Sequence, residues 1–319
     1  MTAYHPLIVH HMGALENSSN PTDPHSPPFP PNSLEAIRAC LEVNAPFIEI
    51  DITALADSDY LLVHDPVLES ETTGFGAVGG CTTAQARSLF LKSGPLGEPL
   101  PYRPAFLSDV VTLFGAFPKS NTRLQLDFKN VYPFFGDEPL RRLIDLLQPL
   151  GNRAIVSTGA DWQLRQLHTL APWLDLGLDI HFYIDYRPQG TLFDPRQPPF
   201  RCGVQGYWDD HPLAMFPFWG KTDYLAERCA YILDSVPYVS TFYVSYRFLL
   251  QSLSDGFDWT AAAHARSIRI DAYTLDLRGP DQIATANQLI AVGVDQFTTN
   301  FPRAFAVLLN GQTQKTAVV

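Results

Sequence analysis

Two carboxylates two residues apart interrupt the apolar run FIEIDI (47–52), and they are the first sign of chemistry in this sequence. In a β-strand, residues i and i+2 point to the same face, so Glu49 and Asp51 project together, about 6 to 7 Å apart along the strand. The run LDFK sets Asp127 and Lys129 on one face in the same way. A strand that is only buried has no use for such charges, because each one is costly to remove from water.

If these two strands are neighbours, three carboxylates and one ammonium group crowd the same strand ends. Carboxylates at such short range repel one another, and a divalent cation would compensate both the repulsion and the lost hydration. All the ligands would be oxygen atoms, which suits Mg²⁺ or Ca²⁺, and no Cys/His cluster indicates zinc. We predict a metal site formed by Glu49, Asp51 and Asp127. The plainer alternative is that Glu49 and Asp51 pair with Arg or Lys on adjacent helices.

Two histidines are candidates for proton transfer. His11 ends the first β-rich run, and His64 directly precedes Asp65. Imidazoles beside a metal-bound phosphate can act as general base and general acid, because their unperturbed pKa is close to neutral. A single histidine at a strand end is more often structural, but two beside an acidic cluster favour a catalytic pair. His10 competes with His11, since strand parity puts the two on opposite faces and the pattern alone does not choose.

These residues need a scaffold, and short β-rich runs alternate with helical patterns along the chain. We expect strands at 7–11, 47–52, 123–128, 153–158, 174–182, 240–246, 268–275 and 296–299. We expect helices at 33–43, 107–117, 140–150, 161–171, 221–233 and 281–293. This alternation predicts the α/β class and a TIM (β/α)8 barrel, whose active sites lie at the C-terminal strand ends. The run YLLVH (60–64) follows a spacer too short for a helix, which predicts a hairpin arm after the second strand.

Two segments do not fit the barrel periodicity. Residues 14–31 and 186–220 are rich in proline and are expected to be long loop insertions, and long loops on a compact barrel are often functional. The stretch MFPFWGKTDY (215–224) would be either a lid or lipid-facing patch, or a loop packed onto the barrel. We find no internal repeat and no linker, so residues 1–319 are interpreted as one domain, with a flexible C-terminal tail at 311–319.

Composition restricts the function classes. The 319 residues carry a formal net charge of −11 with no Lys/Arg block, which argues against a broad surface for nucleic acid and leaves a small-molecule substrate. Four cysteines without CxxC spacing indicate free thiols. No apolar run approaches the roughly 20 residues of a transmembrane segment. The N-terminus lacks a signal-peptide pattern, so a cytoplasmic location is the expectation.

Taken together, these motifs resemble the glycerophosphodiester phosphodiesterase family of TIM-barrel enzymes. That family opens with a strand ending His-Arg-Gly, followed by Pro-Glu-Asn-Thr-Leu, Glu-x-Asp and then His-Asp-Pro-x-Leu with a Thr-Thr-x-Gly-x-Gly turn. In this chain the corresponding stretches are HMG (11–13), PPNSLEAI (30–37), EID (49–51), HDPVL (64–68) and TTGFG (72–76). Later matches are DFK (127–129), AYTLD (272–276) and GVDQFTTNFP (293–302), so the resemblance extends from residue 7 to about 308.

The resemblance implies roles for individual residues. Glu49, Asp51 and Asp127 would bind one divalent cation, Mg²⁺ or Ca²⁺. His11, rather than His10, would form the acid/base pair with His64, because the glycine two positions later fixes the register. Lys129 would contact a phosphate oxygen, and Tyr273, at the family's late Trp-Thr strand, would bind substrate. The implied reaction is metal-dependent hydrolysis of a glycerophosphodiester to an alcohol and glycerol phosphate, with a cyclic phosphate as a possible intermediate.

Some positions depart from the family pattern. Met12 and Glu71 stand where the family often carries arginines, and Pro31 stands where it has Glu. His-Met at the first strand, Asp in the acidic-x-Lys strand and TNFP near the end resemble the related sphingomyelinase D/phospholipase D branch. One alternative is therefore cleavage of a lysophospholipid or sphingolipid headgroup. Another is a barrel that binds a phosphodiester without cleaving it.

Overall fold

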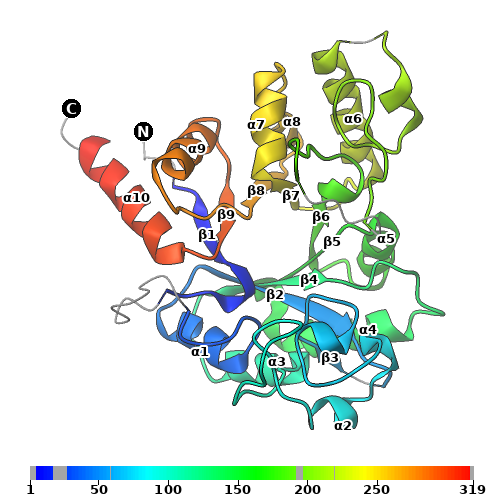
Figure 1. The fold of residues 1–319 in the computed structure, drawn as a ribbon, viewed down its shortest axis with the longest axis vertical. Helices are drawn as coiled ribbons and strands as arrows, with labels where there is room; N and C mark the ends of the chain where they lie inside the picture. The colour runs from blue at the N-terminus through cyan, green and yellow to red at the C-terminus, as the bar shows by residue number, and fades with distance from the viewer. Residues whose placement is uncertain (1–4, 17–26, 58, 192–196, 219, 317–319) are drawn as a thin grey trace.

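Eight parallel strands close into a barrel, as the sequence predicts. The computed structural model describes residues 5–16, 27–57, 59–191, 197–218 and 220–316. The barrel strands are β1 (Leu7–His10), β2 (Phe47–Ala54), β4 (Arg123–Phe128), β5 (Ala154–Thr158), β6 (Asp175–Asp179), β7 (Thr241–Ser245), β8 (Arg269–Tyr273) and β9 (Gln296–Thr299). They pair in this order around the sheet, and the parallel β1–β2 and β1–β9 pairings close it (Figure 1). The predicted TIM-barrel class is confirmed.

The hairpin arm after the second barrel strand is also confirmed. Strand β3 (Tyr60–Leu61) runs antiparallel to the end of β2, with Thr53 opposite Leu61. The arm is shorter than the expected 60–64, because Leu62 donates its N–H to Ala105 instead of continuing the pairing with β2. His64 consequently lies in the irregular backbone beyond the arm.

Helices surround the barrel (Figure 1). The six expected helices are α1 (Leu34–Glu42), α3 (Leu107–Gly115), α4 (Glu138–Leu147), α5 (Asp161–Leu170), α6 (Lys221–Ser235) and α9 (Pro280–Ala291). Four more were not expected: α2 (Thr83–Ala86), α7 (Tyr246–Ser254), α8 (Trp259–His264) and α10 (Pro302–Thr316). Helix α7 was not predicted from the sequence, because it begins directly after β7 and no turn residue marks the boundary between them. Helix α10 continues through the expected flexible tail as far as Thr316.

Short 3₁₀ helices occupy several of the connections. They are η1 (His11–Gly13), η2 (Leu68–Ser70), η3 (Val78–Gly80), η4 (Gln148–Arg153), η5 (Ile180–Phe182) and η6 (Pro212–Met215). Two of them, η1 and η5, begin immediately after barrel strands β1 and β6. Such tight turns hold the residues that follow a strand close to the barrel mouth.

Strand β2 shows how alternation divides the core between two layers. Ile48, Ile50 and Ile52 are fully buried and belong to the large core between the strands and the helices. Phe47 belongs instead to a small cluster inside the barrel with Val9, Ile155 and Tyr243, and Tyr273 packs against it. Because side chains alternate along a strand, Glu49 and Asp51 share the inward face with Phe47. The apolar cluster therefore forms the floor on which the acidic residues lie.

The two expected loop insertions are only partly described by the structure. Of residues 14–31, the segment 17–26 lies outside the described part of the chain. The described parts of 186–220 are irregular apart from η6 and are tied to α6 by a buried network around Asp209. The Asp209 carboxylate accepts from Arg228 Nε at 2.5 Å and from the Tyr224 hydroxyl at 2.7 Å. None of the helices in the described part of the chain has the length and apolar composition needed to cross a membrane.

We predict that Asp209→Ala destabilises the protein more than any surface ion-pair variant. The Arg228 side chain is 2% exposed, so the substitution leaves an uncompensated buried charge, which costs about 3 kcal/mol or more. Urea unfolding followed by circular dichroism measures the change. The matched control is Asp234→Ala, which breaks an exposed pair with Arg266 and should cost less than about 1 kcal/mol. Equal losses for the two variants would contradict the structural role assigned to Asp209.

Candidate active site

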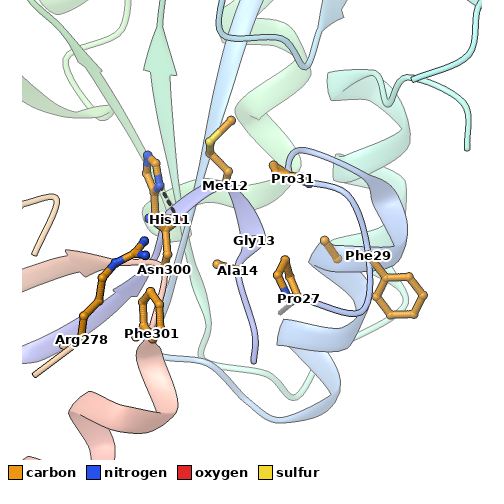
Figure 2. A pocket seen from close by; sticks show the side chains of 11 residues that line it. His11, Met12, Gly13, Ala14, Pro27, Phe29, Pro31, Arg278, Asn300 and Phe301 are labelled. Carbon is orange, nitrogen blue, oxygen red and sulfur yellow. Dashed lines mark hydrogen bonds between the residues drawn. The ribbon is translucent and has the colours of Figure 1, made fainter. Parts of the chain in front are cut away.

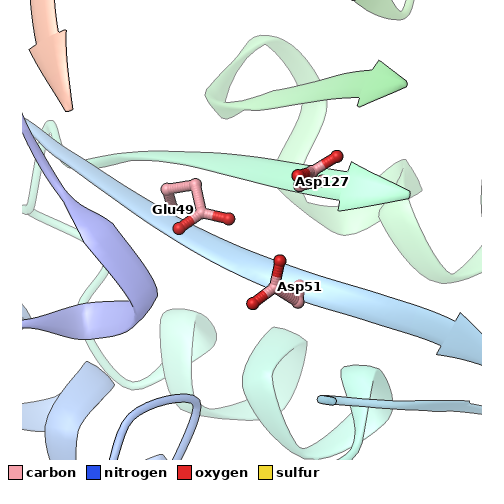
Figure 3. A group of neighbouring side chains, drawn as sticks. All are labelled: Glu49, Asp51 and Asp127. Carbon is pink, nitrogen blue, oxygen red and sulfur yellow. The ribbon is translucent and has the colours of Figure 1, made fainter. Parts of the chain in front are cut away.

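Strand register brings the three predicted carboxylates together. Strands β2 and β4 pair in parallel with Asp51 opposite Asp127, and Glu49 lies two residues earlier on the same face of β2 (Figure 3). One oxygen from each of the three carboxylates lies within 4.8 Å of the others. Glu49 and Asp51 are 3% and 1% exposed. The convergence expected from the sequence is therefore present in the structure.

Lys129 lies against this acidic cluster. Its Nζ is 2.9 Å from Asp51 Oδ1 and 2.6 Å from Asp127 Oδ2, so the lysine bridges two of the three carboxylates. The prediction that Asp127 and Lys129 share a face of their strand agrees with this contact. The plainer alternative was that Glu49 and Asp51 pair with Arg or Lys on adjacent helices. In the structure the lysine that pairs with Asp51 instead follows the end of strand β4.

One ammonium group does not balance three neighbouring carboxylates, of which Glu49 and Asp51 are buried and Asp127 is partly buried, and the pKa values reflect this. Burial raises the pKa of Glu49 well above its ordinary value, and the charges of Asp51 and Asp127 raise it further. Burial also raises the pKa of Asp127. For Asp51 the effect of burial is outweighed, chiefly by Lys129 and then by His64, and its pKa is lowered. The pKa of Lys129 is raised well above its usual value because Asp127 and Asp51 outweigh its burial. The cluster retains an excess of negative charge that another cation would relieve.

Backbone and amide groups position the carboxylates from the other side. The Met12 N–H donates to Glu49 Oε2 at 2.8 Å. Asn32 Nδ2 donates to Asp51 Oδ2 at 2.9 Å, and its Oδ1 accepts the Asp51 N–H at 3.2 Å. Met12 and Asn32 both have positive φ, 52° and 56°, a conformation that asparagine tolerates better than most residues. Asn32 lies in the stretch PPNSLEAI (30–37), but it was not among the predicted site residues.

His11 lies at the barrel mouth and His10 does not. His10 is 5% exposed, and its Nδ1 is 2.8 Å from the Ala14 carbonyl oxygen and 3.5 Å from the Cys40 thiol on α1. Burial lowers the pKa of His10 to about 4, so it is a neutral core residue. His11 begins η1 directly after β1, and its charge is among the groups that lower the pKa of Asp51, so its ring lies within electrostatic range of the acidic cluster. The structure therefore makes His11 the candidate for chemistry.

Asn300 fixes which nitrogen of His11 carries a proton. His11 Nδ1 lies 2.9 Å from Asn300 Oδ1, and Asn300 Nδ2 donates to Asp276 Oδ2 at 3.2 Å. Since a carboxylate only accepts, the amide must turn its nitrogen to Asp276 and its oxygen to His11. His11 Nδ1 is then the donor, and its Nε2 is left with a lone pair when the ring is neutral. Asn300 and Asp276 were not among the predicted site residues, although both lie in motifs quoted there.

His64 is held in a comparable way on the hairpin-arm side. Its Nδ1 is 2.9 Å from Asp65 Oδ1, and its side chain is 48% exposed. Glu71 Oε1 accepts the backbone N–H groups of both His64 and Asp65, at 2.7 and 2.9 Å. Glu71 therefore fastens the turn that carries His64, which is a positive reason for a carboxylate where the related family often has arginine. His64 is among the groups that lower the pKa of Asp51, so the imidazole lies within electrostatic range of the cluster.

A second polar group lies at the ends of β6 and β8. The Tyr273 hydroxyl donates to Asp179 Oδ1 at 2.8 Å, and His181 Nδ1 lies 2.7 Å from the same oxygen. Burial would lower the pKa of His181, but Asp179 outweighs it and raises that pKa. The charge of Asp179 also contributes to the raised pKa of Asp127, so the two groups are close. Tyr273 was predicted, whereas Asp179 and His181 were missed despite the strand-end signal DIH.

A pocket of about 510 Å³ opens beside His11 (Figure 2). Its lining consists of His11, Met12, Gly13, Ala14, Pro27, Phe29, Pro31, Ala36, Arg278, Asn300 and Phe301. Gly13 is needed at the turn below it, because φ is 71° and a Cβ there would lie 3.3 Å from the Ala36 Cβ. The pocket adjoins the acidic cluster through Met12, whose N–H reaches Glu49. The pocket is thus lined by His11 and lies next to Glu49, the first of the three clustered carboxylates.

Comparison with known proteins gives both a sequence and a fold relationship. No family model matches the chain. A glycerophosphodiester phosphodiesterase from Caldanaerobacter subterraneus subsp. tengcongensis is 24% identical over 179 residues, which cover 54% of this chain and 65% of that protein. The match thus spans less than two thirds of the relative's length.

Solved structures match nearly the whole chain. A Galdieria sulphuraria protein provisionally described as a glycerophosphodiester phosphodiesterase has a TM-score of 0.65 at 14% identity, covering 97% of this chain and all of that one. An Oleispira antarctica phosphodiesterase, solved with its product sn-glycerol-3-phosphate, has a TM-score of 0.61 at 16% identity, with 96% and 97% of the two chains covered. The chain therefore has the barrel fold of the glycerophosphodiester phosphodiesterases and is similar in sequence to one of them.

Proposed function

We propose that this protein is a phosphoric diester hydrolase that cleaves glycerophosphodiesters to an alcohol and glycerol phosphate. The observation that carries the proposal is the convergence of Glu49, Asp51 and Asp127 with Lys129 at the C-terminal strand ends, within electrostatic range of His11 and His64. The reaction named for the Caldanaerobacter relative and the glycerol phosphate bound by the Oleispira protein support this class of substrate. A small phosphodiester fits the absence of a Lys/Arg block, since the local charge is supplied within the site.

The three carboxylates fit a hard divalent cation. Their oxygens are close enough to share one ion, and Lys129 leaves their combined charge uncompensated. We propose that Glu49, Asp51 and Asp127 hold one Mg²⁺ or Ca²⁺, whose chemistry when bound is to withdraw charge from the phosphoryl oxygens. Asn32 and the Met12 N–H keep the carboxylates oriented for this purpose. Lys129 would contact a phosphoryl oxygen as a point charge.

The histidines would move the protons. With Nδ1 of His11 held by Asn300 and Nδ1 of His64 held by Asp65, each ring has Nε2 available for chemistry. We propose that one Nε2 takes the proton of the attacking hydroxyl while the other, protonated, gives its proton to the departing alcohol oxygen. Asn300, Asp276 and Asp65 act by orienting the two rings. Tyr273 would bind the substrate from the opposite side of the mouth.

The attacking group does not have to come from the protein. Cys40 contacts His10, the neighbour of His11 in the chain, and burial raises the pKa of its thiol to about 12, so it is a poor nucleophile. We infer that the substrate's own adjacent hydroxyl attacks the phosphorus and gives a cyclic phosphate, which water then opens. Such a neighbouring nucleophile gains effective molarity from its attachment to the reacting group.

We predict that His11→Ala and His64→Ala each lower kcat/KM for glycerophosphocholine at least roughly a hundredfold, the usual contribution of general acid–base catalysis. Choline release measures turnover, and circular dichroism checks that each variant is folded. The control is His264→Ala: this residue pairs with Asp295, which precedes β9 and so lies at the other end of the barrel. Retained turnover in the His64 variant would refute its role. Binding of glycerophosphocholine without turnover by the wild type would favour a non-catalytic binding barrel.

We also predict that Glu49→Gln weakens Mg²⁺ and Ca²⁺ binding at least about tenfold in isothermal titration calorimetry. The same change should not destabilise the metal-free protein, because it removes a buried carboxylate whose ionised form is disfavoured by burial and by Asp51 and Asp127. A carboxylate with a structural role only would behave in the opposite way, losing stability without changing metal affinity.

The control for this experiment is Asp271→Asn. Asp271 is buried on β8, where it accepts hydrogen bonds from Thr298 at 2.9 Å and Gln296 at 3.3 Å and takes no part in the acidic cluster. Its substitution should leave metal affinity unchanged. Chelation of the wild type should abolish turnover, and added Mg²⁺ or Ca²⁺ should restore it, with the better activator identifying the ion.

A further inference from the structure

The pocket beside His11 has two chemically different sides. Figure 2 shows one side formed by polar side chains, namely His11, Arg278 and Asn300. The other side is formed by apolar side chains, namely Pro27, Phe29 and Pro31. Met12 and Ala14 lie between the two sides, and the Phe301 ring lies on the polar side next to Arg278 and Asn300. A pocket that is polar beside the proposed catalytic histidine and apolar away from it is complementary to an amphiphile.

We propose that this pocket binds an apolar chain, so that the preferred phosphodiester carries one acyl or alkyl substituent in addition to its polar alcohol. The inference rests on the proposed function and names the substrate class of the same site. The pocket volume, about 510 Å³, falls in the range of roughly 300–1,000 Å³ typical of sites for drug-sized ligands. A phosphodiester of two small polar alcohols would leave most of this space and its apolar wall unused.

Arg278 provides a positive charge on the polar side of the pocket, whereas Met12 occupies a position where the related family often has an arginine. The Arg278 guanidinium lies 5.0 Å from the Phe301 ring centroid and donates from Nη2 to Asp276 Oδ2 at 3.1 Å. The side chain is 68% exposed, and a guanidinium has five N–H donors, so donors remain for a phosphoryl oxygen. We assign Arg278 to the phosphate at the junction between the catalytic centre and the apolar wall.

Exposed apolar side chains in the connecting loops agree with the same substrate class. In the described part of the chain, the large hydrophobic residues that are at least 80% exposed are Phe75, Leu96, Tyr132, Phe135 and Phe218. Tyr132 and Phe135 lie between β4 and α4, and Phe218 lies between β6 and α6, in loops that follow the C-terminal ends of barrel strands. Phe75 and Leu96 lie in the long connection between β3 and α3. Such side chains suit an enzyme that collects its substrate from lipid aggregates.

A binding experiment tests the pocket directly. The probe is dodecylphosphocholine below its micelle-forming concentration, a phosphodiester with one alkyl chain, and it is compared with glycerophosphocholine by isothermal titration calorimetry. We expect the alkyl probe to bind at least roughly tenfold more tightly to the wild type. Ala14→Phe, which fills the pocket, should remove this difference, whereas Ala230→Phe on the exposed face of α6 should preserve it. Phe29→Glu, which charges the apolar side, is a second variant if Ala14→Phe fails to fold.

Turnover separates this inference from the proposed function. We expect Ala14→Phe to lower kcat/KM for lysophosphatidylcholine roughly tenfold more than it lowers kcat/KM for glycerophosphocholine, because the added ring occupies the space assigned to the apolar chain. Equal wild-type affinity for the two phosphocholine ligands, or equal effects of Ala14→Phe and Ala230→Phe, would overturn the inference while glycerophosphocholine hydrolysis could still stand. Chain-dependent binding without hydrolysis of either substrate would uphold the pocket and overturn the proposed reaction.

Discussion

Mutual repulsion among Glu49, Asp51 and Asp127 is the interaction on which the rest of the site depends. Two buried carboxylates and one partly buried carboxylate lie close together, although a single lysine pairs with only two of them. An amide N–H from η1 and the side chain of Asn32 approach from one side, and Lys129 approaches from the end of β4. Such crowding lowers stability, which agrees with the proposal that the cluster holds a cation.

Strand alternation explains how the barrel tolerates this crowding. On β2, the isoleucines turn outward into the large core, and the inward face passes from Phe47 to the two carboxylates. The apolar cluster below the site excludes water from the barrel floor, while the carboxylates lie near the mouth. The same sequence of six residues therefore provides both the packing that stabilises the strand and the charge that would bind the ion.

The fold and the acidic cluster were predictable because they depend on short-range regularities. Period-two alternation in FIEIDI and LDFK fixes the facing of the carboxylates, and the β/α alternation fixes that their strands are neighbours. The partners of the histidines were not predictable in this way. Asn300 is 289 residues from His11, so only the closed barrel shows that its amide orients the ring. Similarly, the sequence shows Glu71 only as a carboxylate at a position where the related family often has arginine. Nothing in the neighbouring residues indicates that this carboxylate accepts hydrogen bonds from two backbone amides.

The bond between His11 and Asn300 also has a consequence for biogenesis. It joins the residue that follows the first barrel strand to the residue that follows the last one, and β1 is paired with β9 along its whole length. During synthesis on the ribosome, the acidic residues of β2 and β4 emerge early, but the ring of His11 has no fixed orientation until the final strand arrives. The acidic cluster therefore depends on the pairing of β2 with β4, whereas the orientation of the His11 ring depends on the closure of the barrel by β9.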